Sequence, residues 1–400
     1  MGDIMKENKN IPEIRFEGFE GEWIQKEIKE LFKITRGEVL AATETSQVKT
    51  GFMTYPVYSS QTKNNGLMGY YHDYLFENAI TWTTDGANAG TVKYRKGKFY
   101  STNVNGVLLS DDGYANQAIA ESINIIAWKH VSYVGNPKLM NNVMSKIKIY
   151  ISDSLEEQQL ISDYFNTFDT FITLEQQKHD KLVTLKKAML EKMFPKEGAS
   201  VPEIRFEGFE GKWEERNIGQ IAKVSTGYPF ESNLFNDKGK LLVITNGNIQ
   251  NNSAFVDKSV GNRIDINNDI ILNEYILKKN DILVTMDGTV GRTAKVKEQN
   301  QILAQRVGRL TSNTEAEFLY QFLNTGKFFQ KMMSISHGGT IKHISLLEIS
   351  NYKDLVPTNK KEQSQIGSYF QNLDKLISLQ QQKIDKLKNI KKACLDKMFV

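Results

Sequence analysis

Two segments of the chain have nearly the same sequence: EEQQLISDYFNTFDTFITLEQQKHDKLVTLKKAMLEKMF at residues 156–194 and KEQSQIGSYFQNLDKLISLQQQKIDKLKNIKKACLDKMF at residues 361–399. Aligned without gaps, they are identical at 21 of 39 positions. Neither contains glycine or proline after Tyr164 and Tyr369, and Pro195 directly follows the first copy. Each segment is therefore predicted to be one long helix, and the proline ends the first.

Steps of three and four residues along both segments select a mostly apolar stripe, typical of a coiled-coil seam. We expect the two helices to pack antiparallel against each other, with pairing to other subunits as the alternative. A helix of about 37 residues at about 1.5 Å per residue would be roughly 55 Å long. The seam is predicted to contain Ile161, Phe165, Phe168, Ile172, Leu182, Met189, Ile366, Phe370, Leu373, Ile377, Ile384 and Leu387.

A shorter repeat precedes each half of the chain, PEIRFEGFEGEW at residues 12–23 and PEIRFEGFEGKW at residues 202–213. Its copies are 190 residues apart and the helical copies 205 apart, so the material between them differs in length. The motif is rich in glutamate, which repels phosphate. Its aromatic residues, Phe16, Phe19 and Trp23 in the first copy, are instead predicted to attach each half to the helices or to a partner.

The repeats form a common frame around two regions that we could not align with each other. The predicted fold class is α+β: two β-rich domains joined by two long helices in an antiparallel coiled coil, with pseudo-twofold symmetry. The predicted divisions are 1–23 (polar leader and first 12-residue motif), 24–152 (first region), 153–195 (first long helix), 196–213 (linker and second motif), 214–357 (second region) and 358–400 (second long helix).

Both regions have short apolar runs separated by glycine- and asparagine-rich turns, the pattern of a β-sheet. In the first region we expect strands within 54–60, 66–71, 79–84, 90–95 and 106–110, with turns at 64–66, 85–90 and 95–98. In the second region we expect strands within 241–245, 281–286, 288–296 and 307–311, and a helix within 315–333.

The predicted turns carry the polar side chains that in other proteins contact DNA bases and phosphates. The same residue types also occupy turns for backbone reasons alone, so each candidate has a structural alternative. Arg292, Arg306 and His343 are the strongest, although Arg306 could instead pair with a carboxylate. The candidates are Tyr58, Ser60, Gln61, Lys63, Asn64, Thr84, Asn88, Arg95, Lys98, Asn103, Asn246, Asn248, Asp287, Arg292, Gln305, Arg306, Thr340, Lys342 and His343.

Composition and motifs argue against several classes of protein. The net charge of +4 is too small to indicate nucleic-acid binding by itself, and no apolar run reaches the roughly 18–20 residues that span a bilayer. The single cysteine, Cys394, and the absence of a signal-peptide pattern suggest a cytoplasmic protein. We find no phosphate-binding glycine loop, methyltransferase tetrapeptide or metal-binding histidine spacing. His337 and His343, six apart, are compatible with a turn, a phosphate contact or a metal.

Several blocks occur in an order that resembles the specificity (S) subunits of bacterial type I restriction–modification systems. They are the paired 12-residue motifs, the EEQQLI and KEQSQI helix starts, YPVYSSQTKNNGLMGYY (55–71), AITWTTDGANAGTV (79–92), ILVTMDGTVGR (282–292) and HGGTIKHISLLEI (337–349). The resemblance covers essentially the whole chain.

The resemblance implies a non-catalytic subunit that recognises double-stranded DNA. Each region would be a target recognition domain that reads one half of a bipartite site, with helices long enough to span roughly 16 base pairs. Two methyltransferase (M) subunits and the nuclease/translocase (R) subunits would perform adenine-N6 methylation or cleavage, and would bind S-adenosylmethionine, ATP and Mg. Two alternatives remain: the specificity subunit of a restriction enzyme that cuts on both sides of its site, and a coiled-coil scaffold without a DNA role.

Overall fold

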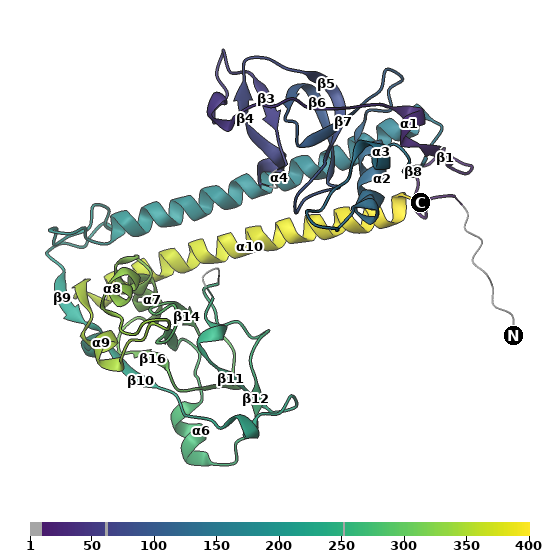
Figure 1. Ribbon diagram of the computed structural model, residues 1–400. Coiled ribbons are helices and arrows are strands. Elements are labelled where there is room, and N and C mark those ends of the chain that lie inside the picture. The colour runs from purple at the N-terminus through teal and green to yellow at the C-terminus, as the bar shows by residue number, and fades with distance from the viewer. Residues whose placement is uncertain (1–9, 61–62, 251–252) are drawn as a thin grey trace, which may run out of the picture. The chain divides into compact units, whose positions relative to one another are not determined.

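The computed structural model describes residues 10–60, 63–250 and 253–400. The chain forms two compact units, each of mixed helix and sheet (Figure 1). The first unit comprises Met1–Gln176 and Lys383–Val400, and the second comprises Gln177–Gln382. Each unit therefore contains one of the two β-rich regions and a part of both long helices.

A six-stranded sheet forms the centre of the first unit, in the order β2-β7-β5-β6-β3-β4. All neighbouring strands are antiparallel except β3 and β6, which are parallel. Because β3 pairs in parallel with β6, its chain direction brings the end of β3 beside the end of β6. The strands are β2 (Lys33–Arg36), β3 (Tyr55–Tyr58), β4 (Leu67–Tyr71), β5 (Phe76–Thr83), β6 (Val92–Ser101) and β7 (Asn105–Leu109).

The two faces of this sheet differ because side chains alternate along each strand. Ile80 and Trp82 on β5 pack with helix α2 (Gln117–Ala127) in an apolar core. Thr81 and Thr83 alternate with these two residues along β5 and therefore belong to the opposite face, where a polar pocket lies. One face thus packs against α2, and the other carries both a small apolar cluster around Phe99 and the polar pocket.

The second unit has a four-stranded sheet in the order β10-β16-β13-β14 and a three-stranded sheet in the order β12-β11-β15. Its main core packs helix α7 against the first sheet and the long helices. The elements are β10 (Ala222–Thr226), β11 (Leu241–Ile244), β12 (Arg263–Ile264), β13 (Ile282–Thr285), β14 (Thr293–Lys295), β15 (Gln301–Leu303), β16 (Val307–Ser312), α6 (Asp269–Tyr275), α7 (Ala316–Leu323) and α8 (Lys327–Ile335).

A small two-stranded sheet closes each region at its chain ends. In the first unit the strand after the 12-residue motif pairs with the strand before the long helix, and the second unit repeats this arrangement. The first set comprises β1 (Ile24–Glu27), α1 (Ile28–Leu31), α3 (Asn141–Met144) and β8 (Lys148–Ile151); the second comprises β9 (Glu214–Asn217), α5 (Ile218–Ile221), α9 (Leu346–Asn351) and β17 (Lys353–Val356).

The long helices are α4 (Leu155–Met193) and α10 (Lys360–Met398), each of 39 residues, drawn in teal and yellow in Figure 1. In the first unit Asp169 of α4 contacts Lys391 of α10, and Glu175 contacts Lys383. The residue number rises along one helix as it falls along the other, so the two segments run antiparallel. In the second unit Lys186 contacts Asp374.

The stripe of predicted seam positions is the sheltered side of both helices. None of the twelve predicted seam residues is exposed; Phe165, Phe370 and Ile384 are fully buried. Apolar residues off the stripe, such as Phe171 and Leu376, are about half exposed. In each unit the side of the helices that the heptad pattern selects is therefore the one covered by protein.

Two predicted features of the regions are wrong. The predicted turn at 95–98 is part of strand β6, which continues through it with a bulge where Gly97 takes a φ of 74° opposite Asn78. The helix predicted within 315–333 is two helices, α7 and α8, which separate at Gly326 with a φ of 96°. Both the bulge at Gly97 and the separation at Gly326 need a glycine with a positive φ, which the periodicity of apolar residues does not indicate.

Candidate nucleic-acid interface

Three loops of the first unit meet beyond the end of β5. They are the β5–β6 connection (84–91), the β6–β7 turn (102–104) and the loop 132–138; we call them the first loop cluster. Backbone hydrogen bonds join them: Thr84 N–H donates to Val104 O at 3.0 Å, and Leu139 N–H donates to Thr84 O at 2.8 Å. Gly86 N–H donates to Pro137 O at 2.9 Å, so the cluster is fixed by main-chain atoms.

The second unit builds the same cluster from residues 286–292, 304–306 and 337–343, the second loop cluster. Here Gly288 N–H donates to Lys342 O and Ile344 N–H donates to Met286 O, each at 2.9 Å. The bridge between Asp85 and Lys138 in the first cluster corresponds to the bridge between Asp287 and His343 in the second. The two regions, which could not be aligned by sequence, therefore share a backbone arrangement.

Different side chains occupy these shared positions. In the second cluster Asp287 accepts a hydrogen bond from Arg306 Nη1 at 3.2 Å, and its other oxygen lies 2.5 Å from Nδ1 of His343. Arg306 adopts a φ of 65°, and its side chain is 66% exposed. A non-glycine residue in this conformation costs energy and is most common at functional sites. The exposed guanidinium of Arg306 and imidazole of His343 are thus held side by side by Asp287, whose carboxylate is largely covered.

The other candidates of the second region are dispersed. Asn246 lies against the cluster, since its Oδ1 accepts from Met286 N–H at 3.2 Å. Asn248 is fully buried, and its amide is used inside the protein by Thr245, Asp257 and Val260. Around the cluster, Gln305 and Thr340 are exposed and Lys342 is half-buried; Arg292 is half-buried, with no hydrogen-bond partner for Nε in the described chain.

Sequence reasoning missed Lys138, which occupies in the first cluster the position of His343 in the second. It is exposed, and the loop before it carries the exposed Tyr133 and Val134. A signal was available: residues 138 and 343 differ by 205, the same offset that aligns the helical repeats. That offset places the two residues in register, but the shared backbone arrangement of their loops is visible only in the structure.

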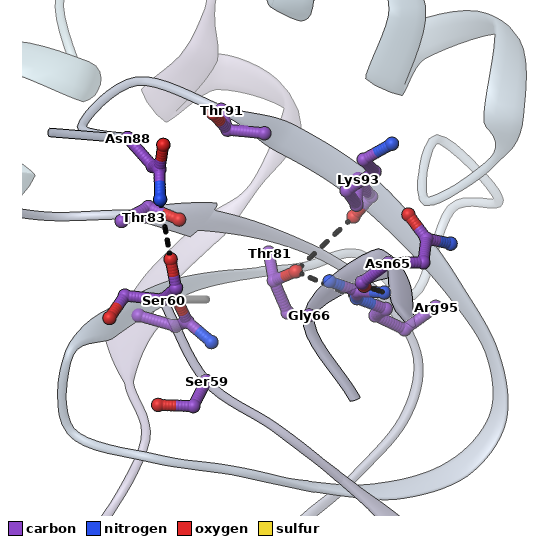
Figure 2. Close-up of a pocket in the computed structure, with 11 residues that line it drawn as sticks. Ser59, Ser60, Asn65, Gly66, Thr81, Thr83, Asn88, Thr91, Lys93 and Arg95 are labelled. Carbon is purple, nitrogen blue, oxygen red and sulfur yellow. Dashed lines mark hydrogen bonds between the residues drawn. The ribbon is translucent and has the colours of Figure 1, made fainter. Parts of the chain in front are cut away.

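Arg95 on β6 is a buried candidate of the first region, only 6% exposed. Figure 2 shows it among the side chains around a pocket. Its Nε donates to Thr81 Oγ1 at 3.1 Å and its Nη1 to Asn65 O at 2.8 Å. The guanidinium lies 3.8 Å above the ring centre of Tyr58, a favourable cation–π distance. Burial lowers the pKa of Arg95 to about 10.

Arg95 lines a pocket of about 170 Å³ on the face of the sheet opposite α2. Ser60 and Asn88 also line it, and the Asn88 amide donates to Ser60 O at 3.1 Å. Figure 2 shows these polar groups around one hollow. The pocket brings together Ser60, Asn88 and Arg95, three residues that the sequence offered separately, and Tyr58 contacts the Arg95 guanidinium.

The remaining candidates of the first region lie elsewhere. Thr84 is buried and donates its hydroxyl to Val104 O at 2.9 Å, so it is not presented to solvent. Asn103 is exposed at the β6–β7 turn, and Asn64 is exposed with a φ of 49°. Lys98 is exposed beside the ring of Tyr74. Gln61 and the side chain of Lys63 lie outside the described residues.

The repeated 12-residue motifs attach to the long helices. Arg15 forms a bidentate ion pair with Glu157 at the start of α4, and Arg205 forms the same pair with Glu362 at the start of α10. Ile14 N–H donates to Lys397 O at the far end of α10. Ile204 N–H likewise donates to Lys192 O, so each motif joins the beginning of one long helix to the end of the other.

Two lysines of the long helices, Lys391 and Lys186, connect the helices to the β-rich regions. Lys391 contacts Asp169 of α4 and Glu121 of α2, each at 2.8 Å; we call these three residues the Lys391 cluster. Burial would lower the pKa of Lys391, but the two carboxylates raise it overall. In the second unit Lys186 pairs with Asp374, which accepts from Gln321 of α7. Polar seam positions thus mark where a region docks on the helices.

Neither a cluster of metal-ligating side chains nor a membrane-spanning helix occurs in the part of the chain that the structure describes. Residues 10–60, 63–250 and 253–400 contain no group of three or more metal-ligating side chains; His337 and His343 instead contact Glu348 and Asp287. Over the same described parts, the chain forms no helix with the length and apolarity to cross a bilayer.

Comparisons with known proteins agree with this arrangement. The profile of the type I restriction modification DNA specificity domain matches residues 20–184 and 210–389. A protein named as a type I specificity subunit N-terminus from Mycoplasma pneumoniae is 38% identical over 144 residues, which is 35% of this chain and 75% of that protein. The specificity subunit of the MjaVIII type I restriction enzyme of Methanocaldococcus jannaschii is 24% identical over 342 residues, 80% of this chain and 78% of the relative.

Solved structures show the same fold. The crystal structure of the S subunit of a type I restriction–modification system from M. genitalium superposes with a TM-score of 0.70 at 16% identity, covering 98% of this chain and 99% of that one. The family profile matches once in each half of the chain, in keeping with the duplicated frame. The chain belongs to the family of type I restriction–modification DNA specificity subunits.

Proposed function

We propose that each recognition region reads one half of a bipartite DNA site through its loop cluster. The observation that supports this most directly is that one backbone arrangement carries different side chains in the two units. The first cluster presents Lys138 and Asn103 where the second presents His343 and Gln305. A fixed scaffold with exchanged polar side chains is what reading two different short sequences requires.

The chemistry in this proposal belongs to partner subunits. M subunits would methylate adenine at N6 and R subunits would cleave unmodified DNA, with S-adenosylmethionine, ATP and Mg bound in those subunits. This division is supported by family membership and by a sequence without the nucleotide-binding or methyltransferase motifs. The specificity subunit would itself be non-catalytic.

We also propose that the long helices set the gap between the half-sites. Each helix of 39 residues is about 58 Å long at about 1.5 Å per residue. At about 3.4 Å per base pair this corresponds to roughly 17 base pairs. That length suits two short recognised sequences separated by a gap that is not read.

Single-molecule sequencing of methylated adenines tests the proposal in a host that carries this chain and its M subunit. We expect one asymmetric bipartite motif. Replacing only residues 214–357 by the corresponding region of another family member should change one half of the motif and keep the other. A contiguous motif, or a swap that changes both halves, would contradict the assignment of one half-site to each region.

The same assay tests the role of the helices. Inserting one helical turn after Lys181 and one after Lys386 is expected to lengthen the unread gap while both half-sites stay unchanged. Restoring the original length should restore the original gap. Unchanged spacing with full methylation in the lengthened chain would show that the helices do not set it.

A further inference from the structure

Arg95 differs from the other buried cations of this protein in its partners. Lys295 lies 2.7 Å from Glu317, and Arg309 lies 2.7 Å from Asp281. Arg95 is equally buried, yet it has no carboxylate within ion-pair distance anywhere in the described residues. Its neighbours are a threonine hydroxyl, a main-chain carbonyl and the ring of Tyr58.

A buried charge without a counter-charge is costly, and a structure usually avoids it by pairing. Burial lowers the pKa of Arg95 to about 10, so the guanidinium remains charged near neutral pH. The contacts to Thr81 and Asn65 hold it in place but bring no negative charge. The missing partner is therefore an anion from outside the chain.

The pocket is suited to an oxyanion. Its volume is about 170 Å³, and hydroxyl and amide side chains surround the guanidinium. Arginine has five N–H donors, and the two bonds described above engage only Nε and Nη1, so donors remain for an incoming acceptor. The lining includes Ser59, Ser60, Thr83, Asn88 and Asn105.

We infer that this pocket binds one backbone phosphate of the DNA at the half-site of the first region, so that Arg95 positions the duplex and does not read a base. Phosphates project from the duplex as compact anions, whereas base edges lie inside a groove and are neutral, so a recessed cation without a counter-ion is matched to a phosphate. The inference rests on the proposed function. It assigns the reading of DNA bases to the loop clusters, and to Arg95 the positioning of the duplex along the protein.

Fluorescence anisotropy tests this with the complex of the chain and its M subunit, on a duplex that contains the mapped site. Arg95→Met is expected to weaken binding about tenfold or more, equally on the mapped site and on single-base variants. It should also reduce the slope of log K against log salt by about 0.9. Lys96→Met removes an exposed positive charge from the same strand and serves as the matched control.

A scan of methylphosphonate substitutions identifies the phosphate. A methylphosphonate at one position of the duplex should weaken binding by the wild-type complex and by the Lys96→Met complex. The same substitution should have no further effect on binding by the Arg95→Met complex. Thr81→Val, which removes one hydrogen bond from the guanidinium, should reduce the effect partly and keeps the test valid if Arg95→Met does not fold.

Three outcomes overturn the inference. If every methylphosphonate effect persists in Arg95→Met, no phosphate pairs with Arg95. If 7-deazaguanine at one position instead removes the effect of Arg95→Met, Arg95 reads a base. If the wild-type complex binds all duplexes equally, the proposed function itself fails, and this inference fails with it.

Discussion

The ion pair between Arg205 and Glu362 allows a quantitative prediction, because the first unit contains a matched copy. Glu362 is only 1% exposed and accepts from Arg205 Nε at 2.7 Å and Nη2 at 2.8 Å. It also accepts from Trp213 Nε1 at 3.2 Å. The hydrogen bond to the Glu362 carboxylate raises the pKa of Arg205.

Glu362→Gln keeps the shape of the side chain but removes the charge and turns one acceptor into a donor. A guanidinium N–H is then left without an acceptor in a buried position. Breaking a buried pair in this way costs about 3 kcal/mol. Because about 1.4 kcal/mol corresponds to a factor of ten, local opening of the second 12-residue motif should become roughly 100-fold more frequent.

Amide hydrogen exchange followed by mass spectrometry measures this opening. The Ile204 amide, which donates to Lys192 O, and the Trp213 amide, which donates to Ser200 O, should lose protection. The corresponding amides of Ile14 and Trp23 should keep it, since they lie in the other unit. This pattern would assign the loss to the ion pair and not to general destabilisation.

The copy in the first unit provides the matched comparison. Glu157→Gln removes the pair with Arg15, but Trp23 Nε1 has no hydrogen-bond partner in the described chain, so Glu157 lacks the third bond. One hydrogen bond is worth about 1 kcal/mol, so its effect should be roughly fivefold smaller. A loss of less than threefold for Glu362→Gln, or equal losses in both motifs, would refute this reasoning.

Three further predictions concern folding. Lys391→Met leaves two carboxylates of the Lys391 cluster facing each other and should cost about 3 kcal/mol, so the amides of α2 should exchange faster. An unchanged exchange rate would contradict the docking role of the cluster. Gly106→Ala places a methyl group 2.1 Å from the ring of Trp82 and should lower the free energy of unfolding, measured by urea titration, by about 3 kcal/mol. In the control Gly113→Ala no atom lies close to the added methyl group, so the loss should be limited to the smaller strain of its left-handed backbone. Hydrogen bonds from Ser345 lower the pKa of Glu348 below its usual value near 4.5. The ionised Glu348 therefore stabilises the fold above that pH, and this stabilisation is lost as the pH falls through the lowered pKa. In Glu348→Gln the urea midpoint of unfolding should fall less steeply with decreasing pH than in the wild type, and an equally steep fall would refute this.

Local patterns in the sequence were sufficient for the frame. The heptad stripe and the absence of glycine and proline predict helices at 156–194 and 361–399, which the structure has at Leu155–Met193 and Lys360–Met398. Short apolar runs likewise located the five strands β3 to β7. These features depend on neighbours within one or two turns, which is the range over which sequence periodicity is informative.

The candidate site depended on contacts that periodicity does not carry. Turn residues such as Thr84 and Asn88 look alike in the sequence, yet one is buried and the other lines a pocket. Arg95 was a candidate for its residue type alone; only the folded sheet shows that it is buried without a carboxylate.

By itself the sequence determined the duplicated frame, the long helices and the β-rich character of both regions, because repeats and periodicity are properties of the chain. Only the tertiary structure decided that the two regions build the same loop cluster. That cluster is held by main-chain hydrogen bonds, such as Gly86 to Pro137 and Gly288 to Lys342, which almost any side chain permits. Side chains can therefore differ between the two copies while the backbone stays the same, which is why sequence alignment failed where the structures agree.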